Sequence, residues 1–226
     1  MKAIRNTGPG RRVPFMDRFI TFEGIEGSGK STQIARAADY LTARGLEPLC
    51  TREPGGTPIG DALRGILLHP SHGDMTPLTE LLLVYAARVQ HLEEVIQPGL
   101  QAGKVILCDR YEDSTVAYQG FGREIPLNAI KMLSSLSTAG ISPGLTLLLD
   151  LPVEEGLARA HRRNQDDLSE ARLDREAVEF HRRVRQGFLS LAQQHPGRFR
   201  VINAMQPPEK VAHRIAHDLS LFLKLP

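Results

Sequence analysis

Gly24-Ile25-Glu26-Gly27-Ser28-Gly29-Lys30-Ser31-Thr32 is the stretch that decides the fold of this chain. It matches the phosphate-loop pattern G-x-x-x-x-G-K-[ST] at every position, between an expected strand over residues 18–23 and an expected helix over residues 31–44. Glycines let the backbone curl until successive N–H groups converge on phosphate oxygens, and the helix adds the positive end of its dipole. A glycine-rich turn that ends in Lys-Ser by chance is the alternative, and the flanking strand and helix argue against it.

The loop predicts a site for a nucleoside triphosphate, and each of its residues is a candidate ligand of ATP. Lys30 is expected to reach the β- and γ-phosphates, and the Ser31 hydroxyl is expected to hold Mg²⁺. Asp109 ends an apolar strand over residues 104–108, where a second acid that organises Mg²⁺ would lie, although aspartate is also a common cap of such strands. Arg110 comes next and suits a second phosphate, because a guanidinium donates two parallel hydrogen bonds and keeps its charge. A solvated surface arginine is the alternative.

The pattern beyond the loop predicts one domain over residues 18–226. Apolar runs over 46–52, 104–108, 145–151 and 199–203 read as strands, and they alternate with amphipathic stretches that read as helices over 59–69, 77–97, 127–138, 153–163, 173–194 and 208–223. Pro98 is expected to kink or break the second of these helices. Alternating strands and helices predict a five-stranded parallel sheet covered on both faces, which is the three-layer α/β fold of P-loop NTPases.

Composition narrows the class of protein. A hydrophobic content of 41% in 226 residues supports a sizeable core, and a net charge of +2 is too small to indicate a nucleic-acid partner. No apolar run reaches membrane-spanning length, and no targeting signal is recognisable, which indicates the cytoplasm. Residues 1–17 are basic and rich in glycine and proline, so we expect a disordered tail. Cys50 and Cys108 are expected to be small core residues in a reducing compartment.

The long helix places one charge among apolar residues. The helical pattern predicts that Leu81, Leu82, Tyr85, Val89 and Leu92 pack inward. Arg88 shares a face with Val84 at i, i+4 spacing and needs a partner. A base carbonyl, a phosphate or an internal carboxylate would each serve.

Arginines are dense between residues 157 and 185. Arg159, Arg162, Arg163 and Arg175 flank the polar residues 164–170, which suits a lid over about 159–175 that brings cations onto a transferring phosphoryl group. For Arg182, Arg183 and Arg185 we expect a solvated helix paired with acidic residues.

Five blocks of sequence resemble the bacterial thymidylate kinase family, and the resemblance extends from about residue 18 to the C-terminus. They are Phe22-Glu23-Gly24 through Thr32, Thr51-Arg52-Glu53-Pro54-Gly55-Gly56-Thr57, Tyr85-Ala86-Ala87-Arg88-Val89-Gln90-His91, Asp109-Arg110-Tyr111 with Ser114, Tyr118, Gln119 and Gly120, and the weaker Leu173-Asp174-Arg175. A phosphate loop alone is a superfamily signal, whereas these blocks in this order are highly specific. The resemblance implies a homodimer that transfers the γ-phosphoryl group of ATP to dTMP with Mg²⁺.

The resemblance also implies roles for residues at the dTMP site. Arg110 would grip the dTMP phosphate, Tyr118 would pack beside the sugar, and Glu26 would contact the 3′-OH side of the deoxyribose. Arg88 would reach the thymine carbonyl edge, with Thr115 and Gln119 near the base. The remaining candidates for substrate binding in these blocks are Glu53, Pro54, Tyr85 and Ser114.

Three further implications concern regions outside the loop. The phosphate loop contains no arginine, so Arg162 and Arg163 of the lid are the candidates for the catalytic arginine. Asn203, Ala204 and Met205 match the loop that lies against adenine. Val84 departs from the family pattern, which usually carries a phenylalanine that stacks on thymine, and this leaves the details of base recognition open.

Two other functions are compatible with the pattern. The first is another nucleoside monophosphate kinase of the same fold, although Arg88 with Thr115 favours a pyrimidine and Tyr118 favours deoxyribose. The second is an ATP-dependent protein that binds nucleic acid. A motor of that kind needs extra elements that couple hydrolysis to movement, and 226 residues leave little room for them.

Overall fold

The structure is a computed structural model that describes residues 16–163 and 172–225, with the side chain of Arg163 outside the description. A five-stranded sheet lies at its centre, in the order β2-β3-β1-β4-β5, with every pair of neighbours parallel. The strands are β1 (Phe19–Glu23), β2 (Pro48–Arg52), β3 (Val105–Asp109), β4 (Leu145–Asp150) and β5 (Phe199–Asn203). The predicted parallel α/β sheet is confirmed, and its strands fall within a residue or two of the expected ones.

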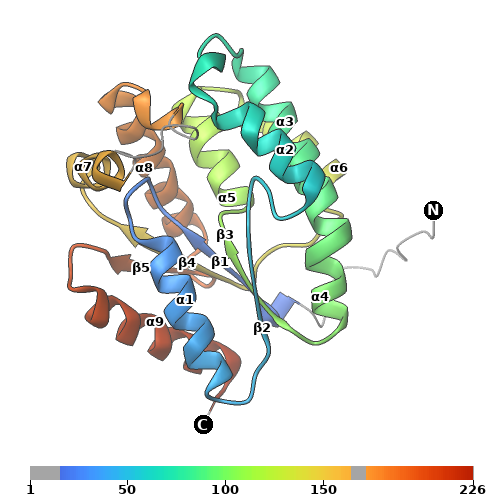
Figure 1. Ribbon diagram of the computed structural model, residues 1–226, viewed down its shortest axis with the longest axis vertical. Coiled ribbons are helices and arrows are strands. Elements are labelled where there is room, and N and C mark those ends of the chain that lie inside the picture. Colours follow the sequence, from blue (N-terminus) through green and yellow to red (C-terminus); the bar gives the residue numbers. More distant parts are fainter. Residues whose placement is uncertain (1–15, 164–171, 226) are drawn as a thin grey trace.

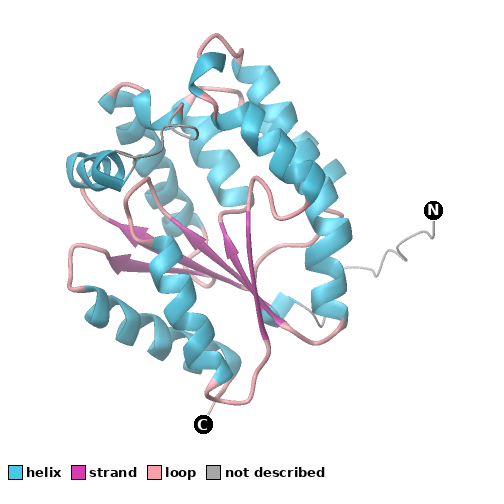
Figure 2. Cartoon of the chain, in the orientation of Figure 1, coloured by secondary structure: helices cyan, strands magenta, loops and turns pink. Residues whose placement is uncertain are grey.

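Helices cover both faces of this sheet, which gives the three layers visible in Figures 1 and 2. The α-helices are α1 (Lys30–Thr42), α2 (Pro58–Leu68), α3 (Pro77–His91), α4 (Gln97–Gln101), α5 (Glu112–Thr115), α6 (Leu127–Ser137), α7 (Val153–Arg163), α8 (Val178–Gln194) and α9 (Pro208–Leu223). Helices α1 and α9 pack together on one face, and α4 packs against β3 on the other. Alternate residues of β3 therefore enter different cores: Leu107 joins the main core, and Ile106 joins the cluster beneath α4.

Short helical pieces of other types complete the chain. They are the 3₁₀ turns η1 (Met16–Arg18), η2 (Pro70–His72) and η5 (Leu173–Arg175), and the π-helical segments η3 (Leu92–Ile96) and η4 (Val116–Gly122). Segment η3 joins α3 to α4 directly, and Pro98, which has no backbone N–H to donate, follows this π-helical segment as the second residue of α4. The helix over 112–122, formed by α5 and η4, was not predicted.

Several expectations from the sequence are wrong in detail. The helix expected over 173–194 begins only at Val178, because Arg172 donates its backbone N–H to Leu68 O and Ala177 is extended. Cys50 is exposed, since β2 is an edge strand, whereas Cys108 is buried as expected. Leu82 and Val89 of α3 are exposed, because that face of the helix points away from the sheet.

Two expected features lie mostly outside the described residues. The N-terminal tail over 1–17 is described only at Met16 and Asp17, which form part of η1. The lid over about 159–175 is described only at its two ends, in α7 and η5. Within the described ranges, no helix combines the length and the apolar character needed to cross a membrane.

Candidate active site

The phosphate loop connects β1 to α1 at the carboxyl edge of the sheet. Gly24 and Gly27 have φ values of 137° and 70°, a region that L side chains rarely adopt. A Cβ on Gly24 would lie 2.4 Å from Leu149 O, and one on Gly27 would lie 2.1 Å from Gly156 O. Both positions therefore require glycine, because of the backbone conformation and because the backbone of β4 or α7 lies too close for a Cβ atom.

Lys30 begins α1 and turns its ammonium group back into the loop. Its Nζ donates to Gly24 O and Ile25 O, both at 3.1 Å, and to Ser28 Oγ at 3.3 Å. Burial and the nearby Arg110 guanidinium lower the pKa of Lys30 to about 8. A triphosphate in the loop would offer this cation stronger acceptors than neutral carbonyl oxygens.

Ser31 and Asp109 lie together at the mouth of the loop. The Ser31 hydroxyl donates to Asp109 Oδ2 over 3.3 Å, although the two residues are 78 positions apart in sequence. A hydroxyl and a carboxylate are the hard oxygen donors that Mg²⁺ prefers, and Mg²⁺ commonly binds through only one or two protein ligands beside substrate phosphates. The donor set present therefore fits the predicted ion.

Arg110 leaves the sheet in an unusual backbone conformation. Its φ is 71°, and its N–H donates to Phe22 O of β1 at 3.0 Å. Nη1 donates to Gly24 O and Ser114 Oγ, and Nη2 donates to Glu26 Oε1. The guanidinium also lies against Tyr118 and lines the cavity, where an anion would meet its positive charge.

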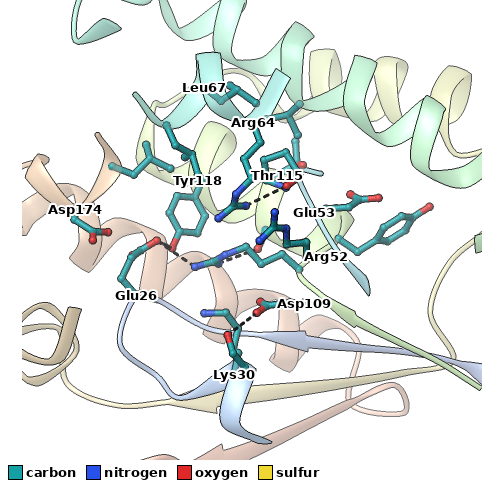
Figure 3. Close-up of a pocket in the computed structure, with 18 of the residues that line it drawn as sticks. Glu26, Lys30, Arg52, Glu53, Arg64, Leu67, Asp109, Thr115, Tyr118 and Asp174 are labelled. Atoms are coloured by element: carbon teal, nitrogen blue, oxygen red, sulfur yellow. Dashed lines mark hydrogen bonds and ion pairs between the residues drawn. The ribbon is translucent and has the colours of Figure 1, made fainter. Parts of the chain in front are cut away.

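Glu26 pairs with Arg110 and also lies beside Tyr118, as Figure 3 shows, and beside His181. Its Oε1 accepts from Arg110 Nη2 at 3.1 Å and from the Tyr118 hydroxyl, and its Oε2 lies 3.4 Å from His181 Nδ1. Burial alone would raise the pKa of Glu26, but His181 and Arg110 together hold it well below its usual range. The carboxylate is thus ionised and oriented before any ligand binds.

Arg88 is paired with internal carboxylates, which was one of the three partners considered from the sequence. Its side chain is 1% exposed; Nε donates to Glu53 Oε2 at 2.7 Å, and Nη1 donates to Glu112. Nη2 donates to Thr115 Oγ1 at 2.9 Å. Burial alone would lower the pKa of Arg88, but Glu53 and Glu112 raise it, so the guanidinium stays charged.

These groups line one cavity of about 820 Å³ above the strand ends. Most of the predicted nucleotide-site residues contribute to its walls: Glu26, Gly27, Gly29, Lys30, Ser31, Thr32, Glu53, Pro54, Val84, Arg88, Asp109, Arg110, Ser114, Thr115, Tyr118 and Gln119. Gly24, Ile25 and Ser28 form the inner side of the loop beneath Lys30. Tyr85 does not line this cavity, because its ring packs with Leu81 and Ile130 and its hydroxyl donates to Glu112.

Of the residues predicted for the lid and for the adenine site, only some lie at the main cavity. Arg159 lines the cavity and donates to Glu155 Oε1 at 2.8 Å and to Ala204 O at 3.2 Å. Arg162 is exposed and donates to Ala158 O within its own helix, outside the cavity lining. The side chain of Arg163 is outside the described residues. Asn203 and Met205 line a smaller hollow beside the Asp150–Arg185 ion pair.

No role in the site was predicted for six charged residues near the cavity. Arg52, Arg64, Glu80, Arg172 and Asp174 line it, and Glu112 pairs with Arg88. Glu80 was recognisable, because it precedes Val84 and Arg88 at i, i+4 intervals on one helix face. Arg172 was not, because its partners Leu67 and Glu80 are distant in sequence. Of the three helix arginines, Arg182 pairs with exposed acids as expected, and Arg183 donates to Gly122 O.

Comparisons with known proteins agree with this geometry. The sequence matches the family model for thymidylate kinase over residues 22–215. A thymidylate kinase of Syntrophotalea carbinolica is 51% identical, over 93% of this chain and 99% of that protein. One of Desulfovibrio desulfuricans is 49% identical, over 91% and 96%. The crystal structure of thymidylate kinase from Ehrlichia chaffeensis superposes with a TM-score of 0.72 at 34% identity, covering 89% of this chain and 97% of that one. The chain belongs to the thymidylate kinase family.

Proposed function

We propose that the protein transfers the γ-phosphoryl group of ATP to dTMP, giving ADP and dTDP. One observation carries this proposal: a single cavity of about 820 Å³ is lined by the phosphate loop, by Arg110, and by the polar side chains of Arg88, Thr115 and Gln119. Figure 3 shows Lys30 of the loop and Thr115 of this polar wall in the same close-up. Loop and arginine come from adjacent strands, so a donor and an acceptor phosphate would meet at one point of the sheet edge. The family to which the chain belongs carries out this reaction.

The reaction needs positioning and charge neutralisation more than covalent chemistry. An oxygen of the dTMP phosphate bonds to the γ-phosphorus, the bond to the bridging oxygen of ADP breaks, and the charge spreads over the transferring group. Lys30 neutralises the donor phosphates, and the Arg110 guanidinium in the cavity wall orients the acceptor. The acceptor phosphate is already anionic, so no strong general base is required.

We propose Ser31 and Asp109 as the residues that hold Mg²⁺. When bound, the ion would neutralise phosphate charge and align the donor. The chain's own contribution at this point is a pair of oxygen donors preset at the loop mouth, 3.3 Å apart.

Several finer assignments stay predictions. The catalytic role of Arg162 and Arg163, the lid over about 159–175 and the adenine contacts of Asn203, Ala204 and Met205 belong to this group, as does location in the cytoplasm. Arg159 is a further candidate for the lid arginine, because it alone of the three arginines at 159, 162 and 163 is described as lining the cavity.

We also propose a homodimer through the face made by α2, α3 and α6. Large apolar side chains are exposed along all three helices: Ile59, Ile66, Leu78, Leu82, Val89, Leu127, Met132 and Leu136. The helices pack side by side, α2 against α3 and α3 against α6, so these side chains lie on neighbouring elements (Figure 1). Apolar patches of this kind on a chain mark an interface. Light scattering during size exclusion should give the mass of two chains.

A coupled assay of ADP release tests the proposed function. With ATP, Mg²⁺ and each of dTMP, dUMP, dCMP, dGMP and AMP, dTMP should give the highest kcat/KM. A higher value for any of the others would overturn the substrate assignment, and absence of ADP release with all five would overturn the reaction class.

A further inference from the structure

Glu80 is a buried carboxylate on α3 that accepts hydrogen bonds from three side chains of two other segments, η4 with its C-cap Arg123 and the residue before η5. Its side chain is 1% exposed. Gln119 Nε2 donates to Oε1 at 2.8 Å, Arg123 donates through Nε at 3.2 Å and Nη2 at 3.0 Å, and Arg172 Nη2 donates to Oε2 at 2.6 Å. Two arginines and one amide thus share a single carboxylate at the wall of the cavity.

This carboxylate is ionised, so it can only accept hydrogen bonds. Burial alone would raise the pKa of Glu80, but hydrogen bonds from Arg123, Gln119 and Arg172 lower it below its usual value. An ionised carboxylate has no hydrogen to donate. The amide of Gln119 must therefore turn its NH₂ group to Glu80, which places Oε1 on the other side of the amide plane.

The side-chain oxygen of Gln119, Oε1, is available as a hydrogen-bond acceptor in the cavity. Gln119 lines that cavity, and its oxygen accepts no hydrogen bond from any residue within the described ranges. Nearby, Thr115 Oγ1 accepts from Arg88 Nη2, so the hydroxyl hydrogen of Thr115 is available as a donor. This wall consequently presents an acceptor, Gln119 Oε1, next to donors, Thr115 and Arg88.

A pyrimidine edge complements this wall only if its ring nitrogen carries hydrogen. In thymine and uracil, N3–H donates and the neighbouring carbonyl accepts; in cytosine, N3 accepts and the neighbouring amino group donates. We infer that Glu80 is a positioning residue for base specificity: it locks the Gln119 amide with its oxygen toward the cavity, so the site takes an imide base and rejects cytosine. This inference rests on the proposed function.

Glu80→Gln tests it, with Glu176→Gln as the matched control. Glutamine at position 80 can donate to Gln119 Oε1, so the Gln119 amide is free to rotate and to present its NH₂ group to the base. Glu176 pairs with Arg123 at 2.6 Å in the same arginine cluster but has no contact with Gln119. The measurement is the ratio of kcat/KM for dTMP to that for dCMP, with the KM for ATP determined in parallel.

We expect Glu80→Gln to lower this ratio about tenfold or more, chiefly through KM, and to leave the KM for ATP unchanged. Glu176→Gln should keep the wild-type ratio, and in a Gln119→Leu background Glu80→Gln should no longer change it. An unchanged ratio in Glu80→Gln, or an equal fall in Glu176→Gln, would overturn the inference. Wild-type enzyme that does not phosphorylate dTMP would instead refute the proposed function.

A second measurement covers the case in which Glu80→Gln does not fold. Competition by N3-methylated dTMP, which lacks the ring N–H, is compared in wild type and Gln119→Leu. We expect methylation to weaken binding to the wild type about tenfold or more and to weaken binding to Gln119→Leu much less. Equal weakening in both proteins would contradict an inward-facing acceptor at Gln119.

Discussion

At one end of the cavity, the phosphate end, Lys30 and Arg110 have backbone carbonyls, hydroxyls and a single carboxylate, Glu26, as partners. At the other end, the proposed base end, Arg88 pairs with two carboxylates. Lys30 donates to Gly24 O and Ile25 O, and Arg110 shares its one carboxylate partner, Glu26, with the Tyr118 hydroxyl. Arg88 is 1% exposed and shares its hydrogens between Glu53, Glu112 and Thr115. The phosphate end is therefore prepared to receive charge, whereas the base end is already neutralised and rigid. Substitutions at the two ends should affect different quantities.

Lys30→Ala should have the largest effect on turnover. It removes the cation of the loop, so we expect kcat to fall about 10³-fold, in line with the loss of a preorganised transition-state donor. The midpoint of thermal unfolding should change little. Lys104→Ala is the control, because Lys104 pairs with the exposed Glu47 far from the cavity and should leave kcat unchanged. A Lys30→Ala enzyme with near-normal kcat would contradict the role given to this end.

Arg88→Ala and Arg110→Ala together test the comparison directly. Without Arg88, the buried Glu53 loses its guanidinium, so urea denaturation should show a fall of about 3–5 kcal/mol in the free energy of unfolding. Arg110→Ala should instead raise the KM for dTMP about 100-fold and leave the KM for ATP near its normal value. An equal rise in the KM values for ATP and dTMP in Arg110→Ala would contradict the comparison. So would a larger fall in the free energy of unfolding in Arg110→Ala than in Arg88→Ala.

Stability should depend on pH through Glu23, beneath the phosphate end. Glu23 accepts from Tyr111 N and Ser114 Oγ, and burial with the nearby Asp113 charge raises its pKa from 4.5 to about 8. The folded protein then holds a proton that the unfolded chain releases, so this contribution is complete below about pH 4.5 and is lost as pH rises to about 8. The difference in unfolding free energy should be about 2–4 kcal/mol. The midpoint of thermal unfolding, measured between pH 5 and 8, should change less with pH in Glu23→Gln than in the wild type. The same change with pH in both proteins would refute this contribution.

Val84→Phe should give the smallest effect and should act only at the base end. Val84 lines the cavity on the same helix face as Glu80 and Arg88. Stacking on an aromatic ring is worth about 1–3 kcal/mol in nucleic-acid-binding proteins, and with the lower end of that range we expect the KM for dTMP to fall about five- to tenfold. The KM for ATP serves as the internal control and should not change. An unchanged KM for dTMP would show that stacking is unimportant in this enzyme.

Most residues of the phosphate end could be predicted from the sequence because they follow one another in short, recognisable motifs. The loop, the strand before it and the helix after it form one local pattern, and Asp109 and Arg110 follow directly from an apolar run. Parallel strands bring such ends to one edge of a sheet, so the meeting of Ser31 with Asp109 follows from the fold class. Local pattern was a poorer guide to Cys50, because whether a strand lies at the centre or the edge of a sheet depends on strand order.

Sequence by itself determined the fold class, and it predicted the phosphate loop and the place of Arg110 directly after a strand, because each depends on short-range pattern and backbone geometry. Only the tertiary structure decided which carboxylates enclose Arg88, that Tyr85 faces away from the cavity, and which way the amide of Gln119 points. Those outcomes depend on side chains from distant segments that compete for the same buried hydrogen bonds. The physical reason is that a buried charge must form hydrogen bonds with the polar groups that the packing places next to it. Which groups these are cannot be read from their separation along the chain.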